Sequence, residues 1–496
     1  MGRGNGWTAH PPLASAAESA ASRAAPAALR LEVADAGRLW RRAVRGVIGA
    51  ARAKEQMGLA DLLSQHLRGS ADELGEMDVV EEQWAAYEHV NVQNALDSWV
   101  SEPQRSHNLV GIIGYQHRPF GLAELLDRGS GHSDPFGTRP GRASRVNRAS
   151  GPDGAVMACL MCALYLVSEG DDRAALLLRG PDPQSGKDDV SLHVVAADAG
   201  FTDRVIGELR RRTIDGNVFR GQVLSFSADI FGRGQALMTF HRRQRLEPEQ
   251  LILPNDVLEL VERQVVGVAR HAERLRQAGQ HLKRGVLLYG PPGVGKTHTV
   301  RYLVGRLEGT TVILLSGDSL HLVAEACSVA RSLQPAMIVV EDVDLIAEER
   351  GHHAGQNPML FQLLNEMDGL GEDVDVVFLL TTNRADLLEP ALAARPGRVD
   401  QAIELALPDP QARRRLFELY TDGLDIDTSG IEEVLQRTEG VTASFLKELI
   451  RRSALLAAER DDSSPLRVAA DDVTTALEEL LDTRNAMTRA VLGGSA

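Results

Sequence analysis

The sequence predicts an α/β fold in which a P-loop, doubly wound parallel sheet is followed by a carboxyl-terminal helical lid. Three apolar segments, at 286–289, 337–340 and 374–380, are each followed by polar residues and a helical stretch. A glycine-rich loop separates the first of these segments from its helix. Ahead of them, the pattern indicates a mostly helical amino-terminal region and a small α+β domain.

Composition limits the class of protein. The chain has 496 residues, with 54 Lys and Arg against 69 Asp and Glu, which gives a net charge of −15. Such a charge argues against nucleic acid as a general partner, because a polynucleotide surface attracts basic proteins. Three cysteines in so long a chain fit a reducing compartment rather than a disulfide framework.

No segment of the sequence has the length of a membrane span. The longest nearly unbroken apolar stretch, residues 155–167, is well below the roughly 18 residues that such a span needs. The first residues also lack the apolar region of a signal peptide. We therefore expect a cytoplasmic protein without a membrane partner.

The chain divides by composition and by hydrophobic period. Leu59, Leu62, Leu63 and Leu67 share one helix face. Segments 174–180, 190–198, 221–226 and 235–240 are expected to be strands around a helix at 201–212, which gives a ββαββ order. The expected divisions are a disordered tail (1–29), a mostly helical region (30–126), a basic linker (127–154), a small α+β domain (155–245), an α/β core (250–408), a helical lid (409–485) and a tail (486–496).

Cys159 and Cys162 form a Cys-x-x-Cys pair, a pattern found in metal and redox sites. A tetrahedral zinc site needs four ligands, and no second Cys or His pair lies nearby in the sequence. Both thiols lie in an apolar, small-residue segment. We interpret them as core residues.

The sequence Gly290-x-x-x-x-Gly295-Lys296-Thr297 is a P-loop in its required context, between an apolar strand and an amphipathic helix. The glycines let backbone N–H groups approach phosphate oxygens, and the following helix adds partial positive charge. Lys296 is expected to reach the β- and γ-phosphates of a nucleotide, and the Thr297 hydroxyl to coordinate Mg²⁺.

Two adjacent carboxylates, Glu341 and Asp342, end the apolar segment 337–340. Acids at the carboxyl end of a buried parallel strand lie where such sheets bind ligands. One acid would hold Mg²⁺ and the other would orient and deprotonate the attacking water.

Several segments together resemble the AAA family of ATPases, within the AAA+ superfamily: GVLLYGPPGVGKT, EDVD, LLNEMDGL, TTNRADLLEPAL, ARPGRVD and LPD. The resemblance covers about residues 250–480. The overall pattern is most similar to bacterial AAA proteins with their own amino-terminal region. It implies an enzyme that binds ATP with Mg²⁺ and hydrolyses it.

The resemblance also implies residue roles. Glu341 and Asp342 match Walker B, with Glu341 and Thr297 at the metal. Asn383 matches sensor 1, which positions the attacking water, and Arg395 and Arg398 match arginine fingers that reach a neighbouring subunit's γ-phosphate. Such fingers imply a homo-oligomeric ring, usually a hexamer in this family. The nucleotide-binding residues implied by Walker A and its flank are Gly290, Pro291, Pro292, Gly293, Val294, Gly295, Lys296, Thr297 and His298.

After Pro408, helices expected near 410–420, 430–437, 443–459 and 470–482 resemble the family's lid. Ala443 and Ser444 match the Gly-Ala positions of the segment that closes over the nucleotide. Residues 251–254 are a candidate adenine-pocket segment.

The chain departs from the family pattern at three places. Walker B usually ends Asp-Glu, whereas here Asp342 holds the catalytic position, one methylene shorter, so we expect slow hydrolysis. Gln401 stands where a further arginine is frequent. The segment 317–335 is short and lacks the aromatic residue of a peptide-gripping pore loop, leaving Leu320 to Val323 as a reduced loop at most.

These observations favour a ring-forming, chaperone-like ATPase that remodels a protein partner chosen by the amino-terminal regions. One alternative is an ATP-switched scaffold with little hydrolysis. A second alternative, a nucleic-acid remodeller, is disfavoured by the net charge.

Overall fold

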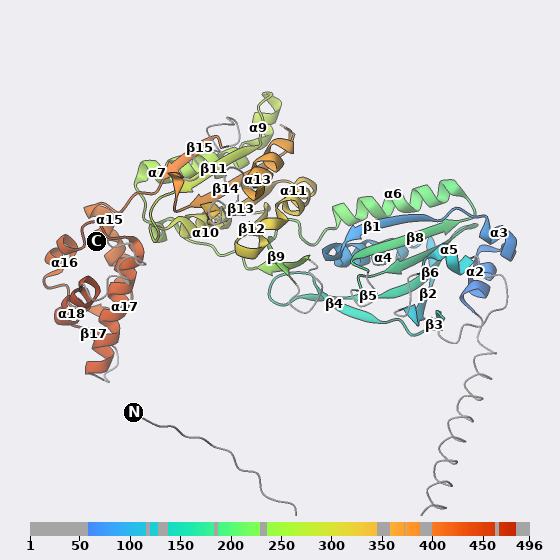
Figure 1. The fold of residues 1–496 in the computed structure, drawn as a ribbon, viewed down its shortest axis with the longest axis horizontal. Coiled ribbons are helices and arrows are strands. Elements are labelled where there is room, and N and C mark those ends of the chain that lie inside the picture. The colour runs from blue at the N-terminus through green and yellow to red at the C-terminus, as the bar shows by residue number, and fades with distance from the viewer. Residues whose placement is uncertain are drawn as a thin grey trace, which may run out of the picture. The chain divides into compact units, whose positions relative to one another are not determined.

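A computed structural model describes residues 58–115, 120–126, 137–182, 187–228, 236–344, 358–371, 373–386, 399–461 and 466–482. Both predicted tails, the finger residues Arg395 and Arg398, and the first part of the expected linker lie outside these ranges. Figure 1 shows the elements in chain order.

The amino-terminal part is built on a six-stranded antiparallel sheet, in the order β1-β8-β7-β6-β2-β3, which we call the antiparallel domain. Helices α4 and α6 pack on one of its faces through a shared apolar core that includes Leu96, Trp99 and Phe201. β4 and β5 form a separate two-stranded pair. The elements are α2 (Leu59–Leu67), α3 (Ala71–Gly75), β1 (Val80–Ala85), η1 (Ala86–Glu88), α4 (His89–Val100), β2 (Arg105–Ile113), α5 (Leu122–Leu126), β3 (Arg139–Gly141), β4 (Arg145–Ala149), β5 (Val156–Leu160), β6 (Cys162–Glu169), β7 (Asp172–Arg179), β8 (Asp189–Ala196) and α6 (Ala199–Asp215).

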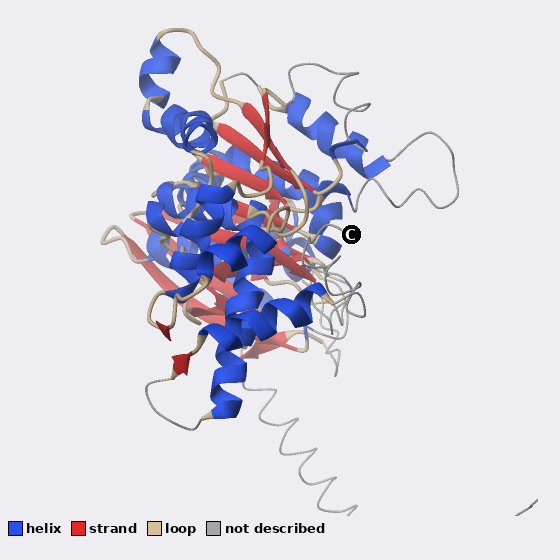
Figure 2. Ribbon diagram, turned by 90° about the vertical axis from the view of Figure 1, so that its left-hand side faces the viewer, coloured by secondary structure: helices blue, strands red, loops and turns tan. Residues whose placement is uncertain are grey.

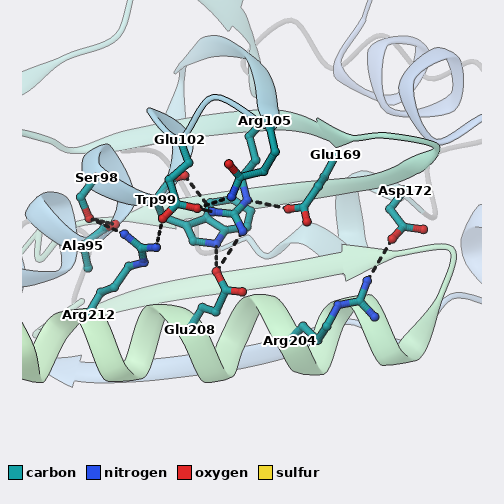
Figure 3. A network of polar contacts seen from close by, with 11 residues as sticks. Ala95, Ser98, Trp99, Glu102, Arg105, Glu169, Asp172, Arg204, Glu208 and Arg212 are labelled. Atoms are coloured by element: carbon teal, nitrogen blue, oxygen red, sulfur yellow. Dashed lines mark hydrogen bonds and ion pairs between the residues drawn. The ribbon is translucent and has the colours of Figure 1, made fainter.

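A buried arginine network joins β2 to α4 and α6 in this domain (Figure 3). The Arg105 side chain, 4% exposed, donates to carboxylates of Glu102 (2.5 Å), Glu169 (2.6 Å) and Glu208 (3.0 Å). Its guanidinium also stacks over the Trp99 ring at 4.3 Å. Because three carboxylates surround it, the charge of Arg105 is compensated although the side chain is out of water.

The second part is a seven-stranded sheet in the order β10-β9-β12-β13-β14-β11-β15, which we call the α/β core. All its neighbours pair in parallel except β9 and β10. The elements are β9 (Val223–Ala228), β10 (Ala236–His241), η4 (Pro248–Gln250), α7 (Asn255–Glu262), η5 (Arg263–Gly267), α8 (Val268–Arg270), α9 (Ala272–Gln277), β11 (Arg284–Tyr289), α10 (Lys296–Arg306), β12 (Thr311–Leu315), η6 (Gly317–Leu322), α11 (Val323–Ser332), β13 (Ala336–Val340), α13 (Pro358–Gly369), β14 (Val376–Thr382) and β15 (Gln401–Glu404).

Both faces of this sheet are covered, which explains its continuous apolar strands. On β13, Ile338 and Val340 enter the core shared with α11 and α13. The alternating residues Met337 and Val339 enter the opposite core, shared with α10. The predicted doubly wound α/β fold is therefore confirmed.

The carboxyl-terminal part is almost entirely helical, as the ribbons nearest the viewer in Figure 2 show. Asp409 and Thr442 cap α15 and α17, each accepting a hydrogen bond from a backbone N–H in the first turn. The helices pack around one apolar core that includes Phe445 and Leu477. The predicted lid helices are confirmed as α15 (Pro410–Thr421), α16 (Ile431–Arg437), α17 (Ala443–Arg460) and α18 (Ala470–Leu481), with short strands β16 (Asp425–Ile426) and β17 (Arg467–Val468).

Three expectations about the amino-terminal half are wrong. β1 and β2, from the region expected to be mostly helical (30–126), belong to the antiparallel sheet. β3 and β4 lie within the expected linker (127–154). β9 and β10 were expected in the small α+β domain (155–245), but β9 pairs in parallel with β12 of the α/β core.

These errors have a common physical cause. Exposed residues alternate with partly buried ones in both β1 and β4, so neither strand shows a continuous apolar run in the sequence. β9 offers its apolar residues Leu224 and Phe226 to the core beneath β12 rather than to the antiparallel sheet. Local pattern identifies a strand but does not specify which sheet it joins.

The core interpretation of the Cys-x-x-Cys pair is confirmed. Cys159 and Cys162 are both buried and free, at the end of β5 and the start of β6. Burial raises the thiol pKa of Cys159 to about 11 and that of Cys162 to about 12. Both groups therefore stay protonated and unreactive near neutral pH.

Candidate nucleotide site

The P-loop of residues 290–295 connects β11 to α10 at the carboxyl end of the parallel strands. Gly290 (φ 148°) cannot carry a side chain, because a Cβ would lie 2.2 Å from the carbonyl oxygen of Leu405. Gly293 is also left-handed, with φ 83°. The loop therefore presents backbone to the space before α10, as phosphate binding requires.

Lys296 begins α10 and is 7% exposed. Its ammonium donates to the carbonyl oxygens of Gly290 at 2.8 Å and Pro291 at 2.9 Å. Burial lowers the pKa of Lys296, and the carboxylates of Asp342 and Asp344 oppose that shift. The two aspartates that follow β13 thus favour the charged form of this lysine.

Glu341 and Asp342 follow β13, as predicted. Glu341 Oε1 is buried and has no hydrogen-bond partner among the described residues. Thr297 is exposed in the first turn of α10. A buried carboxylate oxygen without a donor, together with a hydroxyl, fits a hard cation such as Mg²⁺, which prefers oxygen ligands.

Asn383 lies at the end of β14, the neighbour of β13. Its side-chain amide donates to Asp342 Oδ1 at 3.4 Å. The backbone N–H of Asp342 donates to the Thr381 hydroxyl at 3.1 Å. The structure therefore brings together the predicted base and the predicted water-positioning residue.

Asp344, the second aspartate of Glu-Asp-Val-Asp, has no role in the predictions from sequence. This residue is 7% exposed, and its Oδ1 accepts from the Thr382 hydroxyl at 2.9 Å and from the Asn383 backbone N–H at 3.1 Å. One buried carboxylate thus fixes the turn that carries Asn383. The spacing of the two aspartates, two residues apart, was the available signal.

The predicted adenine-pocket segment spans two apolar cores. Leu251 and Leu253 are buried in the core that contains α10, whereas Ile252 packs against the core of the lid. His298 Nε2 makes a hydrogen bond of 3.0 Å with the carbonyl oxygen of Gln250, which precedes this segment. The segment therefore lies beside the first turn of α10, and its role as an adenine pocket stays a prediction.

The lid contacts the P-loop through the amino terminus of α17. The backbone N–H of Ser444 donates to the carbonyl oxygen of Gly293 at 3.1 Å. A Cβ on Gly293 would lie 2.9 Å from Thr442 Oγ1 and 3.0 Å from Ser444 Oγ. The predicted lid residues thus touch the phosphate-binding loop directly.

Residues 320–323, the candidate reduced pore loop, pack against the α/β core. Leu320 and Val323 are 6% and 2% exposed, and Leu322 packs against the same core. Ser316 caps this short η6 helix. These apolar side chains are therefore not available to grip a peptide, and His321 alone of the four is exposed.

Lys296, Asn383 and Asp342 thus lie beyond the carboxyl ends of β11, β14 and β13, three neighbouring strands of the sheet, as the motif spacing predicts. Arg395 and Arg398 lie outside the described residues, so their roles stay predictions. No helix in the described ranges is both long and apolar enough to cross a membrane.

Comparison with known proteins identifies the α/β core. Residues 286–407 match the ATPase family associated with various cellular activities (AAA). The chain is 35% identical over 249 residues to the ATP-dependent zinc metalloprotease FtsH 2 of Sphaerobacter thermophilus, covering 46% of this chain and 38% of that protein. It is 29% identical over 265 residues to the ATP-dependent zinc metalloprotease FtsH 3 of Symbiobacterium thermophilum, covering 51% of this chain and 42% of that protein.

The alignments span only about two fifths of the length of these relatives. The zinc protease signature His-Glu-x-x-His does not occur in the printed sequence, so the peptidase activity in the relatives' names is not carried over. The family match itself lies within the α/β core. The chain therefore carries an AAA ATPase domain, preceded by an antiparallel domain that the family match does not include.

Proposed function

We propose that this chain binds ATP with Mg²⁺, hydrolyses it, and uses the turnover to remodel a protein partner as part of a homo-oligomeric ring. The observation that carries the proposal is the hydrogen bond between Asn383 and Asp342. Asn383 follows β14, which pairs with β11, the strand that leads into the P-loop and Lys296. Together these residues can bind phosphate and activate a water molecule.

Each residue has a distinct task at this edge. Lys296 binds the β- and γ-phosphates, and Asp342 takes a proton from the water that Asn383 orients. Thr297 and Glu341 would hold Mg²⁺, which neutralises charge on the phosphates when bound. The buried, unpaired Glu341 Oε1 supports this assignment.

The ring and its number of subunits rest on the family resemblance. Arg395 and Arg398 would act on the γ-phosphate of a neighbouring subunit, and a hexamer is the usual assembly of AAA proteins. A planar guanidinium suits the negative charge that is spread over a phosphoryl transition state. Mixing an Arg398→Ala variant with a Lys296→Ala variant should restore part of the activity if the sites are shared.

The partner is proposed to be a cytoplasmic protein that binds the antiparallel domain. Because Leu320 and Val323 are buried, remodelling through this segment by a gripping pore loop is not supported. Force would instead reach the partner through movement of the antiparallel domain.

Steady-state phosphate release, measured with ATP affinity on the same assembled protein, tests this proposal. We expect saturable turnover at the ATP concentrations that fill the site. Tight ATP binding with almost no turnover would instead indicate an ATP-switched scaffold. Affinity capture with Asp342→Asn, which should keep ATP bound, would then recover the partner.

A further inference from the structure

Arg243, which follows β10, donates hydrogen bonds to four backbone carbonyls, two at the end of α10 and one each before β9 and β12. Arg243 Nη1 donates to the carbonyl oxygens of Val304 at 2.5 Å and Leu307 at 2.9 Å. Its Nη2 donates to those of Gly221 at 3.1 Å and Thr310 at 2.7 Å. All four terminal N–H groups of the guanidinium are used.

Two of these carbonyls lie at the carboxyl end of α10, the helix that starts with Lys296. The last carbonyls of a helix have no hydrogen-bond partner within it, and a cation at this end also interacts favourably with the helix dipole. The other two precede β12 and β9. Arg243 therefore fixes the far end of the P-loop helix to the amino-terminal ends of β9 and β12, which lie next to each other in Figure 1.

The segment that carries Arg243 follows α10 over its whole length. A Cβ on Gly305, near the end of α10, would lie 2.6 Å from the carbonyl oxygen of Gln244. At the other end of the helix, the carbonyl oxygen of Gln250 makes the hydrogen bond with His298. Residues 243–250 thus contact both ends of the P-loop helix.

The chain entering β9 is attached just as closely to the antiparallel domain. The backbone N–H of Val218 donates to Asn91 Oδ1 at 2.8 Å. The Tyr87 ring packs edge-on against Phe226, with the ring centroids 5.8 Å apart, and lies 6.4 Å from the Phe219 ring. A continuous set of contacts therefore runs from η1 and α4, through β9 and Arg243, to α10.

We propose that Arg243 is a positioning residue for the nucleotide site and that it couples ATP binding to the antiparallel domain. This inference rests on the proposed ATPase function. A helix moves as a rigid element, so release of its carboxyl end displaces Lys296 at the other end. Misplacement by about 1 Å can cost on the order of a hundredfold in activity. Coupling is reciprocal, so bound ATP must also stabilise the contacts of β9.

Arg243→Ala and Arg243→Lys test the proposal, with Arg245→Ala as the matched control. Arg245 lies on the same segment but forms an exposed ion pair with Glu308, with side chains 72% and 68% exposed. We expect Arg243→Ala to weaken ATP affinity by about fivefold or more. Arg243→Lys should have an intermediate effect, because an ammonium cannot bind all four carbonyls. Arg245→Ala should stay within about twofold of the wild type.

Hydrogen exchange on the full chain provides a readout that loss of stability alone would not mimic. In the wild type, ATP should protect amides of residues 217–228 and 86–91. In Arg243→Ala, saturating ATP should still protect the P-loop but no longer these two segments. If Arg243→Ala does not fold, the hydrogen exchange of the wild type with and without ATP tests the coupling by itself.

Two outcomes overturn the proposal: Arg243 variants with the same ATP affinity as Arg245→Ala, or wild-type protein in which ATP protects only the P-loop and its surroundings. A wild-type protein that binds no ATP would refute the proposed function, and this inference with it. Normal wild-type binding and turnover combined with either of the first two outcomes refutes the inference alone.

Discussion

Asn383 Nδ2 donates a hydrogen bond of 3.4 Å to Asp342 Oδ1, joining the ends of two adjacent parallel strands. Asp342 has φ 51°, a left-handed conformation that aspartate tolerates better than most residues. The shorter acid at the usual glutamate position therefore still reaches the predicted water-positioning amide. This relationship makes the inverted Glu-Asp order compatible with hydrolysis.

Asp344→Ala should impair both stability and turnover. The substitution removes the acceptor of the Thr382 hydroxyl and of the Asn383 N–H, and an unsatisfied buried donor costs about 1–3 kcal/mol. Turnover should fall because Asn383 is no longer fixed. Urea unfolding and phosphate release measure the two effects. Asp344→Asn, which keeps an acceptor oxygen, should retain more of both, and equal losses in the two variants would contradict this role.

Gly293→Ala should weaken ATP binding by disturbing the contact with the lid. Its Cβ would lie 2.9 Å from Thr442 Oγ1, in addition to the strain of φ 83°. Gly423→Ala is the control, since Gly423 has φ 82° but no atom within 4 Å of the added carbon. Both should lose about 1–2 kcal/mol of stability from backbone strain. If both variants bind ATP equally well, the Gly293 contact has no part in nucleotide binding.

Arg105→Ala should destabilise the antiparallel domain by about 3 kcal/mol, because three carboxylates would lose their buried partner. Arg204→Ala removes the neighbouring, exposed ion pair with Asp172 and should cost within about 1 kcal/mol (Figure 3). Thermal unfolding of the two variants gives the comparison. Similar losses of stability in the two variants would show that the Arg105 network is not buried in solution.

The pH dependence of stability should contain opposing contributions from two adjacent residues. Burial raises the pKa of Glu88 to about 7 from 4.5, so the folded state binds its proton more tightly, and this stability is lost as pH rises from 4.5 through 7. Burial lowers the pKa of His89 to about 4 from 6.5, so its contribution is lost as pH falls from 6.5 through 4.

Glu88→Gln separates these two contributions. Relative to the wild type, the variant should gain on the order of 3 kcal/mol between pH 4.5 and 7.5, as about 1.4 kcal/mol accompanies each pKa unit. Urea midpoints across this range measure the gain. Parallel curves for the two proteins would mean that Glu88 titrates normally in the folded state.

The α/β core and the positions of its motif residues could be predicted from the sequence because motif spacing is coupled to strand ends. The apolar segments before Gly290 and Glu341 could only be parallel strands buried on both faces, and parallel strands bring their carboxyl ends to one edge. That logic placed Lys296, Asp342 and Asn383 correctly without coordinates.

The remainder depended on tertiary partners that local pattern does not specify. The pairing of Val223 with Val312 joins two segments about ninety residues apart in the chain, and the hydrophobic period of neither segment predicts this pairing. Arg243 appeared in a basic stretch whose carbonyl partners emerge only from the fold. Asp344 was visible as a residue, but its two donors come from the neighbouring strand.

In the proposed mechanism, Asp342 is the base for ATP hydrolysis by this AAA domain. The decisive measurement is phosphate release by wild type and by Asp342→Asn, each at an ATP concentration shown to saturate binding. We expect equal occupancy of the two proteins and a loss of about a hundredfold or more in turnover for Asp342→Asn. Equal turnover in the two proteins, or no wild-type turnover at full occupancy, would contradict it.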